Sequence, residues 1–545
     1  MKPLHKVSAK RDAAGNAGPP DSRFWIAALL IFVAALVVRL VVYRQMHAWP
    51  LLKEVEALAD ARYYDMMARQ VAAGDLLGSH PYFLSPAFYY VLVLAIARRF
   101  FGETTGWIAG GLLALYGYFI YENLMILPDT LVVLLNLIAL WVLIGIEERL
   151  SLRRALIGGV CIGLAAAARA NALLLAPAAG LLILLCGSAD RRRRLLACAA
   201  LGAGCLLAVA PLTLRNYVVA REFVPLTTTG GRNFWKGNGP EANGTHRFLD
   251  EEEWGQGLTF YVEGKVDSHE AVADSRRLTA QTWDYIGRHP LDTIGLWIKK
   301  LGLFFHAREF GIRDQFYFGR QYSSWLRALP VAFSWLAPLG LVGLLTAWRS
   351  RRGRLAAVAL LVQVLSFTAL FILGRYRLVA ATLLVIFAAH QLVWWSGRLR
   401  ERAWRPILLS AALTLGLVAL VNRPLPEFPR REGFGDQYAA IGDYYIKQRD
   451  CPSALPPLQQ ALVSPWLEQP ALDATQNSIR YRIGLCQLEL GRLQEARATA
   501  DELIERLQRS PEKQHPQLYE ASRQLLQHVE RALAREADAP QAPRP

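Results

Sequence analysis

A short polar stretch after the first long apolar run carries two carboxylates and two tyrosines. It reads DARYYDMMARQ over residues 60–70, and the apolar run covers residues 24–43. On a helix, Asp60, Tyr63 and Tyr64 share one face, because they stand at positions i, i+3 and i+4. A carboxylate held beside a membrane can act as a general base. The alternative is structural, with Asp60 capping the helix or stabilising its dipole.

Acidic residues also mark a turn between two later apolar runs. The sequence YENLMILPDTL, residues 121–131, contains Glu122 and Asp129. An acid at the end of a membrane span is costly unless it is solvated or paired. Two such turns on one side of the membrane can form a single site. Its carboxylates would serve as bases or hold a metal that steadies a phosphate.

A glycine-rich stretch, residues 210–248, offers a different chemistry. Arg215 and Asn216 lie near its start, and TTTGG and NFWKGN follow. Glycines let backbone N–H groups approach an anion, and arginines supply charge, so the stretch is a candidate phosphate site. The alternative is an ordinary turn-rich loop, since the P-loop signature is absent.

Two arginines stand in a short turn that separates two apolar runs. The turn reads GRYRL over residues 374–378 and contains Arg375 and Arg377. Paired arginines at the lipid surface favour phosphate binding. Side chains that only extend towards the membrane interface are the alternative.

Apolar runs make up most of the chain that must position these residues. Of the 545 residues, 53% are hydrophobic and 19% are charged, against about a quarter charged in soluble domains. A membrane-spanning helix needs about 20 mostly apolar residues. The sequence therefore predicts an all-α polytopic membrane protein with about eleven transmembrane helices, over residues 24–43, 86–101, 104–121, 124–146, 152–168, 170–187, 195–213, 328–348, 355–373, 377–396 and 405–421.

The basic residues predict which loops lie on which side. Lysines and arginines cluster in the terminal segment and in alternate short connections, such as RRRR at 191–194, and the opposite turns hold few. The positive-inside rule then places the N-terminus in the cytoplasm. It places loops 44–85 and 214–327, and everything after residue 421, outside. The net charge of +16 thus reflects topology, and we expect no nucleic-acid binding. The run 290–306 has two central lysines and is predicted to lie at the interface as an amphipathic helix.

Three regions follow from these patterns. Residues 1–23 are predicted to be a disordered cytoplasmic N-terminus, and residues 24–423 form the membrane domain. Residues 424–545 begin with a proline-rich link and form a soluble helical tail with a disordered end. The tail is expected to be extracytoplasmic.

The tail contains a weak internal repeat. Gly442 aligns with Gly484, and Ala454 aligns with Ala496. The pattern resembles tetratricopeptide repeats, in which small residues let paired helices pack closely, with a last helix at about 515–537 as the cap. Such a tail usually contacts proteins, and a plain helical cap on the membrane body is the alternative. Cys451 and Cys486 lie in this tail, and the sequence leaves open whether they form a disulfide or stay as two free thiols.

The membrane body resembles the integral-membrane glycosyltransferases of the GT-C fold. The branch is that of protein O-mannosyltransferases and lipid A aminoarabinose transferases. The resemblance covers about residues 24–396. It rests on the order of DARYYDMMARQVAAGD, SPAFYYVLVLAIARRFFG, LPDTL, AAAARANALLLAP, LRNYVVAREFVPLTTTGG with GN, and GRYRL.

The resemblance implies an enzyme with a polyprenyl-phosphate-linked sugar donor and an extracytoplasmic active site. The sugar, a hexose or a pentose, would pass to an acceptor with loss of the lipid phosphate, usually with inversion. Asp60 matches the catalytic acid of the first outer loop, and Asp129 matches the acid of the second. Many relatives carry another acid directly after the first, where this chain has Ala61. We therefore expect no cofactor and no obligatory metal, with a divalent ion as the alternative. The candidate substrate-binding residues are Tyr63, Tyr64, Glu122, Arg215, Asn216, Arg375 and Arg377.

The sequence does not decide which acceptor receives the sugar, and it leaves two other functions as alternatives. The acceptor is a protein, a glycolipid or a polysaccharide, and the tail is a candidate surface for a protein partner. The other functions are a transporter or flippase of lipid-linked substrates, and a non-catalytic scaffold that recruits proteins through its tail. A composition rich in leucine, alanine and arginine indicates a bacterial inner membrane, with membrane lipid around the body and the tail in the periplasm.

Overall fold

The computed structural model describes ten stretches of the chain, and every regular element in them is helical. The described residues are 22–50, 101–125, 127–148, 150–186, 190–246, 268–311, 315–426, 434–464, 473–509 and 516–537. The segment 1–21 and most of the predicted span 86–101 lie outside them.

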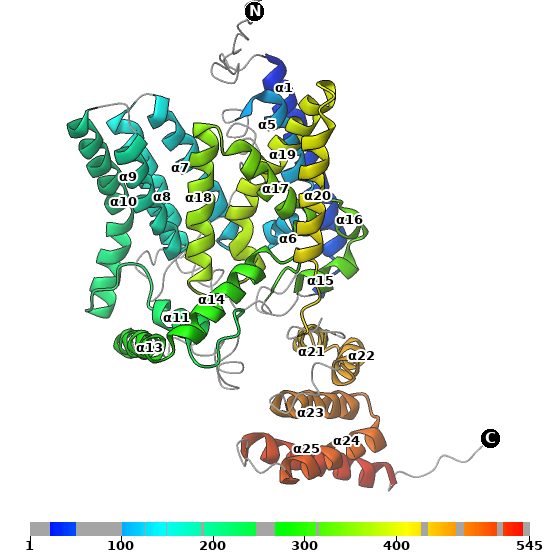
Figure 1. The fold of residues 1–545 in the computed structure, drawn as a ribbon. Coiled ribbons are helices and arrows are strands. Elements are labelled where there is room, and N and C mark those ends of the chain that lie inside the picture. Colours follow the sequence, from blue (N-terminus) through cyan, green and yellow to red (C-terminus); the bar gives the residue numbers. More distant parts are fainter. Residues whose placement is uncertain are drawn as a thin grey trace, which may run out of the picture.

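A bundle of long apolar helices forms the body of the molecule (Figure 1). Its helices, with one short 3-10 helix, are α1 (Ser22–Met46), α5 (Glu103–Ala114), α6 (Gly117–Leu124), α7 (Asp129–Glu148), α8 (Leu152–Ala168), η2 (Ala170–Leu174), α9 (Leu175–Cys186), α10 (Arg191–Ala220), α17 (Phe333–Ala347), α18 (Arg351–Thr368), α19 (Leu378–Arg400) and α20 (Trp404–Val421). The 3-10 turn η4 (Gly374–Arg377) precedes α19.

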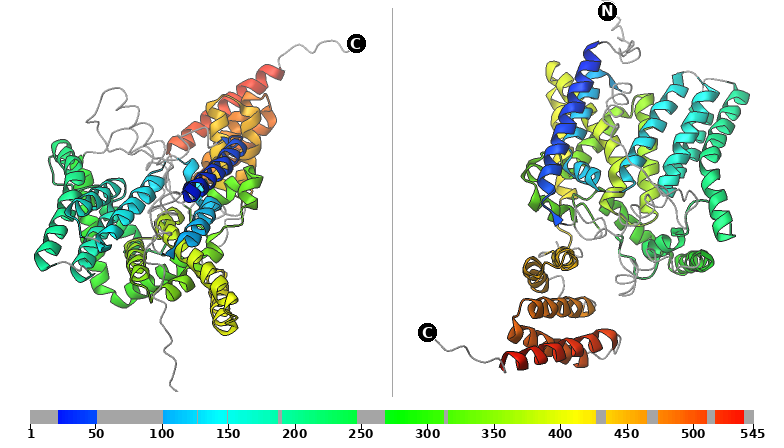
Figure 2. Two further views of the ribbon diagram at one scale, coloured as in Figure 1. Left: turned by 90° about the horizontal axis from the view of Figure 1, so that it is seen from above. Right: turned by 180° about the vertical axis from the view of Figure 1, so that it is seen from behind.

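The remaining helices lie at one end of this bundle. They are α11 (Gly230–Asn238), α13 (Ser268–Arg288), α14 (Pro290–Phe305), α15 (Gln315–Gly319), η3 (Arg320–Tyr322) and α16 (Ser324–Ala328). The tail follows with α21 (Gly435–Lys447), α22 (Cys451–Leu462), α23 (Asp473–Glu489), α24 (Leu493–Arg509) and α25 (Pro516–Ala537). The start of α1 and the tail lie at opposite ends of the bundle (Figures 1 and 2).

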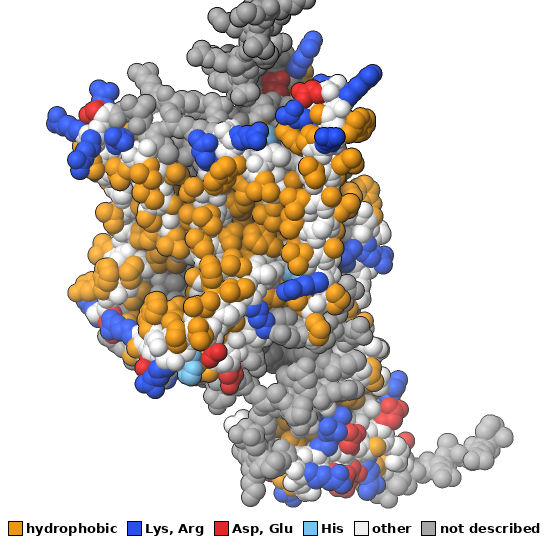
Figure 3. Space-filling view, viewed as in Figure 1, with side chains coloured by type: hydrophobic (Ala, Val, Ile, Leu, Met, Phe, Trp, Pro, Cys, Tyr) orange, Lys and Arg blue, Asp and Glu red, His pale blue; other side chains and the backbone are white. Residues whose placement is uncertain are grey.

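The surface of the bundle identifies a multi-pass membrane protein. On the face that Figure 3 shows, a broad band of hydrophobic side chains covers the bundle, and lysines and arginines gather along the edges of the band. Large apolar side chains in the band are exposed, including Leu206 on α10 and Leu409 on α20. A soluble protein rarely exposes so large a continuous apolar surface, whereas lipid solvates it.

The predicted count of eleven spans is not confirmed. Within the described residues, four helices are long and apolar enough to span by themselves: α1, the stretch of α10 over Arg191–Val218, η4 with α19, and α20. A fifth results if α6 and α7, which meet at a sharp bend, are taken as one broken span. Helices α9, α17 and α18 contain shorter apolar segments.

The predicted span 104–121 is broken into α5 and α6. Tyr116 and Val331 form a parallel β-bridge at the break, and the Gly117 amide donates to the Val331 carbonyl over 3.3 Å. A contact with a distant segment thus replaces the local helical hydrogen bonds. The break lets α6 approach the start of α7 at the end of the bundle that faces the tail.

Helix α14 is not among the spanning helices and lies along that end of the bundle (Figure 1). One face of it packs inward with Lys300, Leu303 and Phe304, and most of its other residues are exposed. The helix is therefore amphipathic, and its predicted place at the membrane interface stays a prediction.

The tail is a stack of consecutive helices that rests on the membrane body. Gly442 on α21 lies against Leu458 on α22, and Ala454 and Ala496 are fully buried. These small residues allow the close helix packing that the repeat pattern requires. The tetratricopeptide assignment itself stays a prediction.

An aromatic cluster joins the tail to the membrane body. Phe318 on α15 is fully buried, and its ring centroid lies 5.3 Å from that of Phe434 and 5.2 Å from that of Tyr438 on α21. Trp49, just after α1, contacts the same Phe318 ring. Buried aromatic pairs of this kind contribute both apolar area and specific geometry.

Each of the two helices α8 and α10 contributes a glycine to the contact between them. A Cβ on Gly204 of α10 would lie 2.2 Å from the backbone oxygen of Leu156, and a Cβ on Gly159 of α8 would lie 2.0 Å from that of Leu201. Neither backbone can accommodate a methyl group unless the helices move apart. Small residues at such contacts are the usual device for close helix association in membranes.

We expect Gly204→Ala to destabilise the protein by about 1–3 kcal/mol, because it overpacks the α8–α10 contact. Gly202→Ala, two residues earlier on the same helix, meets nothing within 4 Å. It should be neutral, or stabilising by up to about 1 kcal/mol through its helix propensity. Thermal unfolding in detergent compares the two variants. Equal loss in both would show that the close contact is not what the glycine provides.

Candidate active site

The predicted residues of the first outer loop lie outside the described residues. Asp60, Tyr63 and Tyr64 belong to this group, so their catalytic and binding roles stay predictions. The other predicted residues are described, and four of them come from three chain segments that meet at the tail-facing end of the bundle.

Asp129 is buried at the first turn of α7 and paired with Arg169, which directly follows the end of α8. Its Oδ1 accepts a hydrogen bond from Nη2 of Arg169, and its Oδ2 has no hydrogen-bond partner among the described residues. The guanidinium of Arg169 also lies 4.1 Å from the ring centroid of Tyr376 in η4. The start of α7, the end of α8 and η4 are therefore held together around one carboxylate.

Glu122 lies on the wall of a small cavity of about 50 Å³ beside this pair. The cavity lining contains Tyr118 and Tyr121 from α6 and Phe316 from α15, together with Arg375 from η4. The side chain of Glu122 is buried, and its Oε2 has no hydrogen-bond partner among the described residues. The cavity thus contains an acid, an arginine and aromatic walls, a combination suited to a sugar and its phosphate.

Arg377 is fully buried, and its guanidinium makes hydrogen bonds within the protein. It donates to the backbone oxygens of Phe304 (2.9 Å), His306 (2.7 Å) and Arg308 (2.7 Å) and to Oε2 of Glu309. The predicted phosphate contact by Arg377 is therefore replaced by internal contacts. Its guanidinium holds the end of α14 and the chain that follows it.

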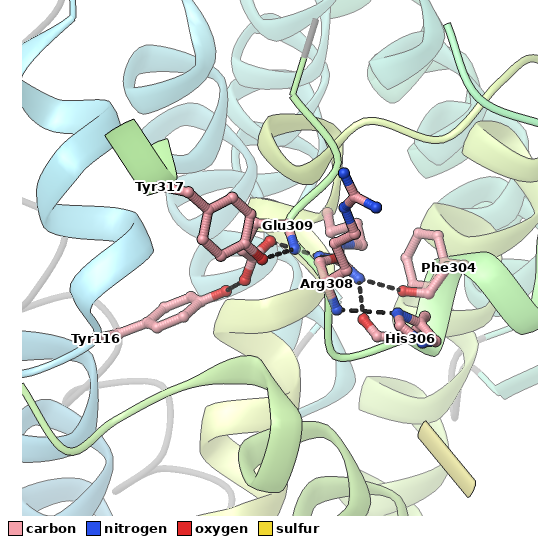
Figure 4. A network of polar contacts seen from close by, with 7 residues as sticks. Tyr116, Phe304, His306, Arg308, Glu309 and Tyr317 are labelled. Carbon is pink, nitrogen blue, oxygen red and sulfur yellow. Dashed lines mark hydrogen bonds and ion pairs between the residues drawn. The ribbon is translucent and has the colours of Figure 1, made fainter. Parts of the chain in front are cut away.

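Glu309 connects Arg377 to the break between α5 and α6. Its Oε1 accepts a hydrogen bond from Tyr116 Oη over 3.0 Å, and its amide donates to Tyr317 Oη over 2.8 Å (Figure 4). Burial raises the pKa of Glu309, and the adjacent Arg377 opposes this effect. Glu309 also lines the cavity that contains Glu122.

A polar chain from α1 supports the two acids of α6 and α7. Arg39 Nε donates to Asn123 Oδ1 over 3.0 Å, and Asn123 Nδ2 donates to Thr130 Oγ1 over 3.2 Å. Asn123 follows Glu122 in the sequence, and Thr130 follows Asp129. These bonds fix the two acidic positions relative to each other and to the first helix.

Arg215 and Asn216 lie near the end of α10, where they hold the following turn. Asn216 Nδ2 donates to the carbonyls of Val224 and Leu226, each over 3.2 Å, and Arg215 Nη1 donates to Asn216 Oδ1 over 3.2 Å. Their contribution to donor binding stays a prediction.

The glycine-rich segment after α10 provides close packing between helices. A Cβ on Gly231 would lie 1.9 Å from the backbone oxygen of Ser275 on α13. Gly237, in the GN pair, lies against the backbone of Leu370 in the same way. The predicted role of these glycines as an anion cradle is thus replaced, at Gly231 and Gly237, by helix and loop contacts.

Asn238, the second residue of the GN pair, holds a buried lysine. Lys300 Nζ donates to Asn238 Oδ1 over 2.7 Å, and Asn238 Nδ2 donates to the carbonyls of Ala369 and Phe234. Lys300 is 1% exposed. Burial lowers its pKa from 10.5 to about 7, because the interior disfavours the charged ammonium.

Sequence reasoning missed Arg169, Glu309 and Tyr116 as site residues. Arg169 stands within AAAARANALLLAP, at a turn where basic residues are rare, and this signal could have identified it. Glu309 and Tyr116 carry no such signal, because their roles depend on contacts across 68 and 193 residues.

No group of three or more His, Cys, Asp or Glu residues in the described ranges is arranged to hold a metal. The described site offers the carboxylates of Glu122 and Asp129, which could transfer a proton or orient a hydroxyl group. It offers Arg375 for a phosphate.

One family model matches the chain. It is described as dolichyl-phosphate-mannose-protein mannosyltransferase and matches residues 79–214. This stretch, about a quarter of the chain, includes Glu122, Asp129 and Arg169. The match supports a mannosyltransferase-like family of the GT-C type, which implies a membrane glycosyltransferase with a lipid-phosphate-linked sugar donor. No curated protein and no solved structure matches the chain at a significant level.

We expect Arg169→Gln to destabilise the protein by about 3–5 kcal/mol, because it leaves Asp129 buried without its charge partner. The double variant Asp129→Asn with Arg169→Gln should recover most of this loss, since no unpaired charge remains. Arg153→Gln, at the exposed start of α8, should change little. Unfolding of the three variants by heat or denaturant gives the comparison, and a double variant no more stable than Arg169→Gln alone would contradict the pairing.

Lys300 should make the stability of the protein depend on pH. Between its pKa of about 7 in the folded protein and its ordinary value of 10.5, the unfolded chain binds more protons, so stability rises with pH. Below pH 7 both states are protonated and the contribution is constant. We expect Lys300→Met to flatten the rise in melting temperature between pH 7 and pH 9, and Lys299→Met to leave it intact. An unchanged slope in Lys300→Met would contradict this assignment.

Proposed function

We propose that this protein transfers a sugar from a polyprenyl-phosphate carrier to an acceptor at the extracytoplasmic face of the membrane, with inversion. The observation that carries the proposal is the cluster of Glu122, Asp129 and Arg169. It lies within the stretch that the mannosyltransferase family model matches, and Arg375 is beside it. The basic connections of the sequence support the placement of this end outside the cytoplasm.

Arg375 is the proposed contact for the donor phosphate. It lines the cavity beside Glu122, whereas Arg377, two residues later, is engaged with Glu309 and backbone carbonyls. A fixed guanidinium would stabilise the negative charge that develops on the leaving phosphate. The tyrosines and Phe316 of the cavity would contact the sugar.

The proposed base is Asp60, which would take the proton of the acceptor hydroxyl as the bond to the anomeric carbon forms. Asp129 is the proposed second acid. It is held by Arg169 and keeps one oxygen without a partner among the described residues. In this scheme Asp129 orients the reacting groups and Asp60 performs the proton transfer. No metal is part of the scheme.

An apolar cavity of about 110 Å³ offers room for part of the lipid chain of the donor. It lies among α7, α8, α9, α18 and α19 and is lined almost entirely by aliphatic side chains. Its two polar lining residues, Asn136 and Gln363, hydrogen-bond each other. A polyprenyl chain would bury its apolar surface here while its phosphate reaches the end of the bundle.

The test is transfer of labelled mannose from polyprenyl-phosphate-mannose in reconstituted membranes, with endogenous membrane protein or lipid fractions as acceptors. We expect activity in the wild type and a fall of at least about a hundredfold in Asp60→Asn, consistent with the loss of a general base. Asp65→Asn, five residues later in the same stretch, is the matched control and should keep its activity.

Arg375→Gln in the same assay tests the phosphate contact. Its activity should fall as well, whereas Arg398→Gln, at the other end of α19, should behave as wild type. Equal activity in wild type and Asp60→Asn would move the base to another residue, with Asp129 the next candidate. A wild type inactive with hexosyl and pentosyl donors alike would overturn the transferase proposal in favour of a transporter or a scaffold.

A further inference from the structure

Two cysteines of the tail meet at the contact between α22 and α23. Cys451 and Cys486 are both free thiols in this structure, and their Sγ atoms lie 2.7 Å apart. The two atoms need to approach by less than about 1 Å to reach the ~2.05 Å of a disulfide bond. Cys451 is 6% exposed and Cys486 is 0% exposed. The packing of the two helices has therefore placed the two sulfur atoms in register, although 35 residues separate them in the sequence.

We propose that Cys451 and Cys486 form a disulfide that locks α22 to α23. The bond forms when one thiolate attacks the disulfide of a thiol oxidoreductase and the second thiolate then displaces that protein. Two thiols lose two protons, and their two electrons reduce the oxidoreductase disulfide to a dithiol. The proposal depends on the extracytoplasmic placement of the tail, where such oxidants act.

The surroundings assign a structural role to this bridge. The two cysteines pack within an apolar cluster that includes Ala454, Leu455 and Ile483. Cys451 Sγ also donates to Oε2 of Glu489 over 3.0 Å. Burial raises the pKa of both thiols, and Glu489 adds to the effect. A dithiol that exchanges electrons in the folded state needs an accessible thiolate of low pKa. This pair has neither property, so the bond forms during folding and then stays shielded.

The bridge lies between the part of the tail that contacts the membrane body and the outer helices of the tail. Helix α21 contacts the membrane body through Phe318, and α22 packs on α21 with Gly442 against Leu458. Helices α23, α24 and α25 extend further from the membrane (Figure 1). A bond between α22 and α23 fixes these outer helices relative to the docked pair. It adds to the partly exposed ion pair of Asp443 on α21 with Arg482 on α23, which joins the same two layers over 2.9 Å.

Counting reactive thiols tests the bridge directly. The chain has six cysteines. The full-length protein is expressed with its membrane, denatured without reductant, and labelled with a maleimide, and the labels are counted by intact mass. With the bridge present, the wild type takes four labels and Cys451→Ser takes five, because the substitution releases Cys486. Without it, the wild type takes six and Cys451→Ser takes five.

The number of labels per chain is measured on denatured protein, so its rise or fall in a variant tests the bridge even if that variant folds poorly. A count that rises by one in Cys451→Ser and in Cys486→Ser supports the bridge, and a count that falls by one overturns it. Cys161→Ser, in the membrane domain, is the matched control. Its label count should be one lower than that of the wild type whether or not the bridge is present. A linked peptide pair in a non-reduced digest identifies the bond. The thiol count does not involve sugar transfer, so its failure is distinct from failure of the proposed activity.

Discussion

The burial of the Arg377 guanidinium organises the end of the bundle that carries the candidate site. A buried charge is tolerated where it is paired and its donors are satisfied. Arg377 is paired with the carboxylate of Glu309, and its two Nη atoms also donate to backbone oxygens at and after the end of α14, where a helix leaves carbonyls without internal partners. Its Nε has no hydrogen-bond partner among the described residues. One side chain between α18 and α19 thereby fixes the end of α14. Through Glu309 it also fixes Tyr116 at the break between α5 and α6.

The short helix α15 links the cavity to the tail. Phe316 packs edge-on against Tyr118 and Tyr121 on the cavity wall, and Phe318 packs against Phe434 and Tyr438 at the start of the tail. The two phenylalanines stand two residues apart on one element, so the cavity wall and the docked tail share a support. An acceptor held by the outer helices would then stand at a fixed position relative to the cavity, with the bridge between α22 and α23 keeping that geometry.

The acidic residues of the site differ in how they are held. Asp129 has a charged partner in Arg169, whereas Glu122 lies beside tyrosines and Arg375 at the cavity. Each keeps one oxygen without a partner among the described residues. Leaving such an oxygen buried without a partner lowers the stability of the protein. A hydroxyl group of a bound substrate could donate to this oxygen and remove the penalty. The support from Arg39 through Asn123 holds both acids in place without using those oxygens.

The sequence by itself determined the helical class, the membrane setting, and the acids and arginines at the ends of apolar runs. These properties are local, since they follow from runs of apolar residues and from charges beside them. Only the tertiary structure decided that Arg377 is an internal contact while Arg375 lines the cavity, although the two stand two residues apart. In the same way it buried Lys300 beside the more exposed Lys299, and it brought Arg169 and Glu309 to the site. These outcomes depend on which helices pack together, because a charge becomes buried or available only through neighbours far away in the sequence.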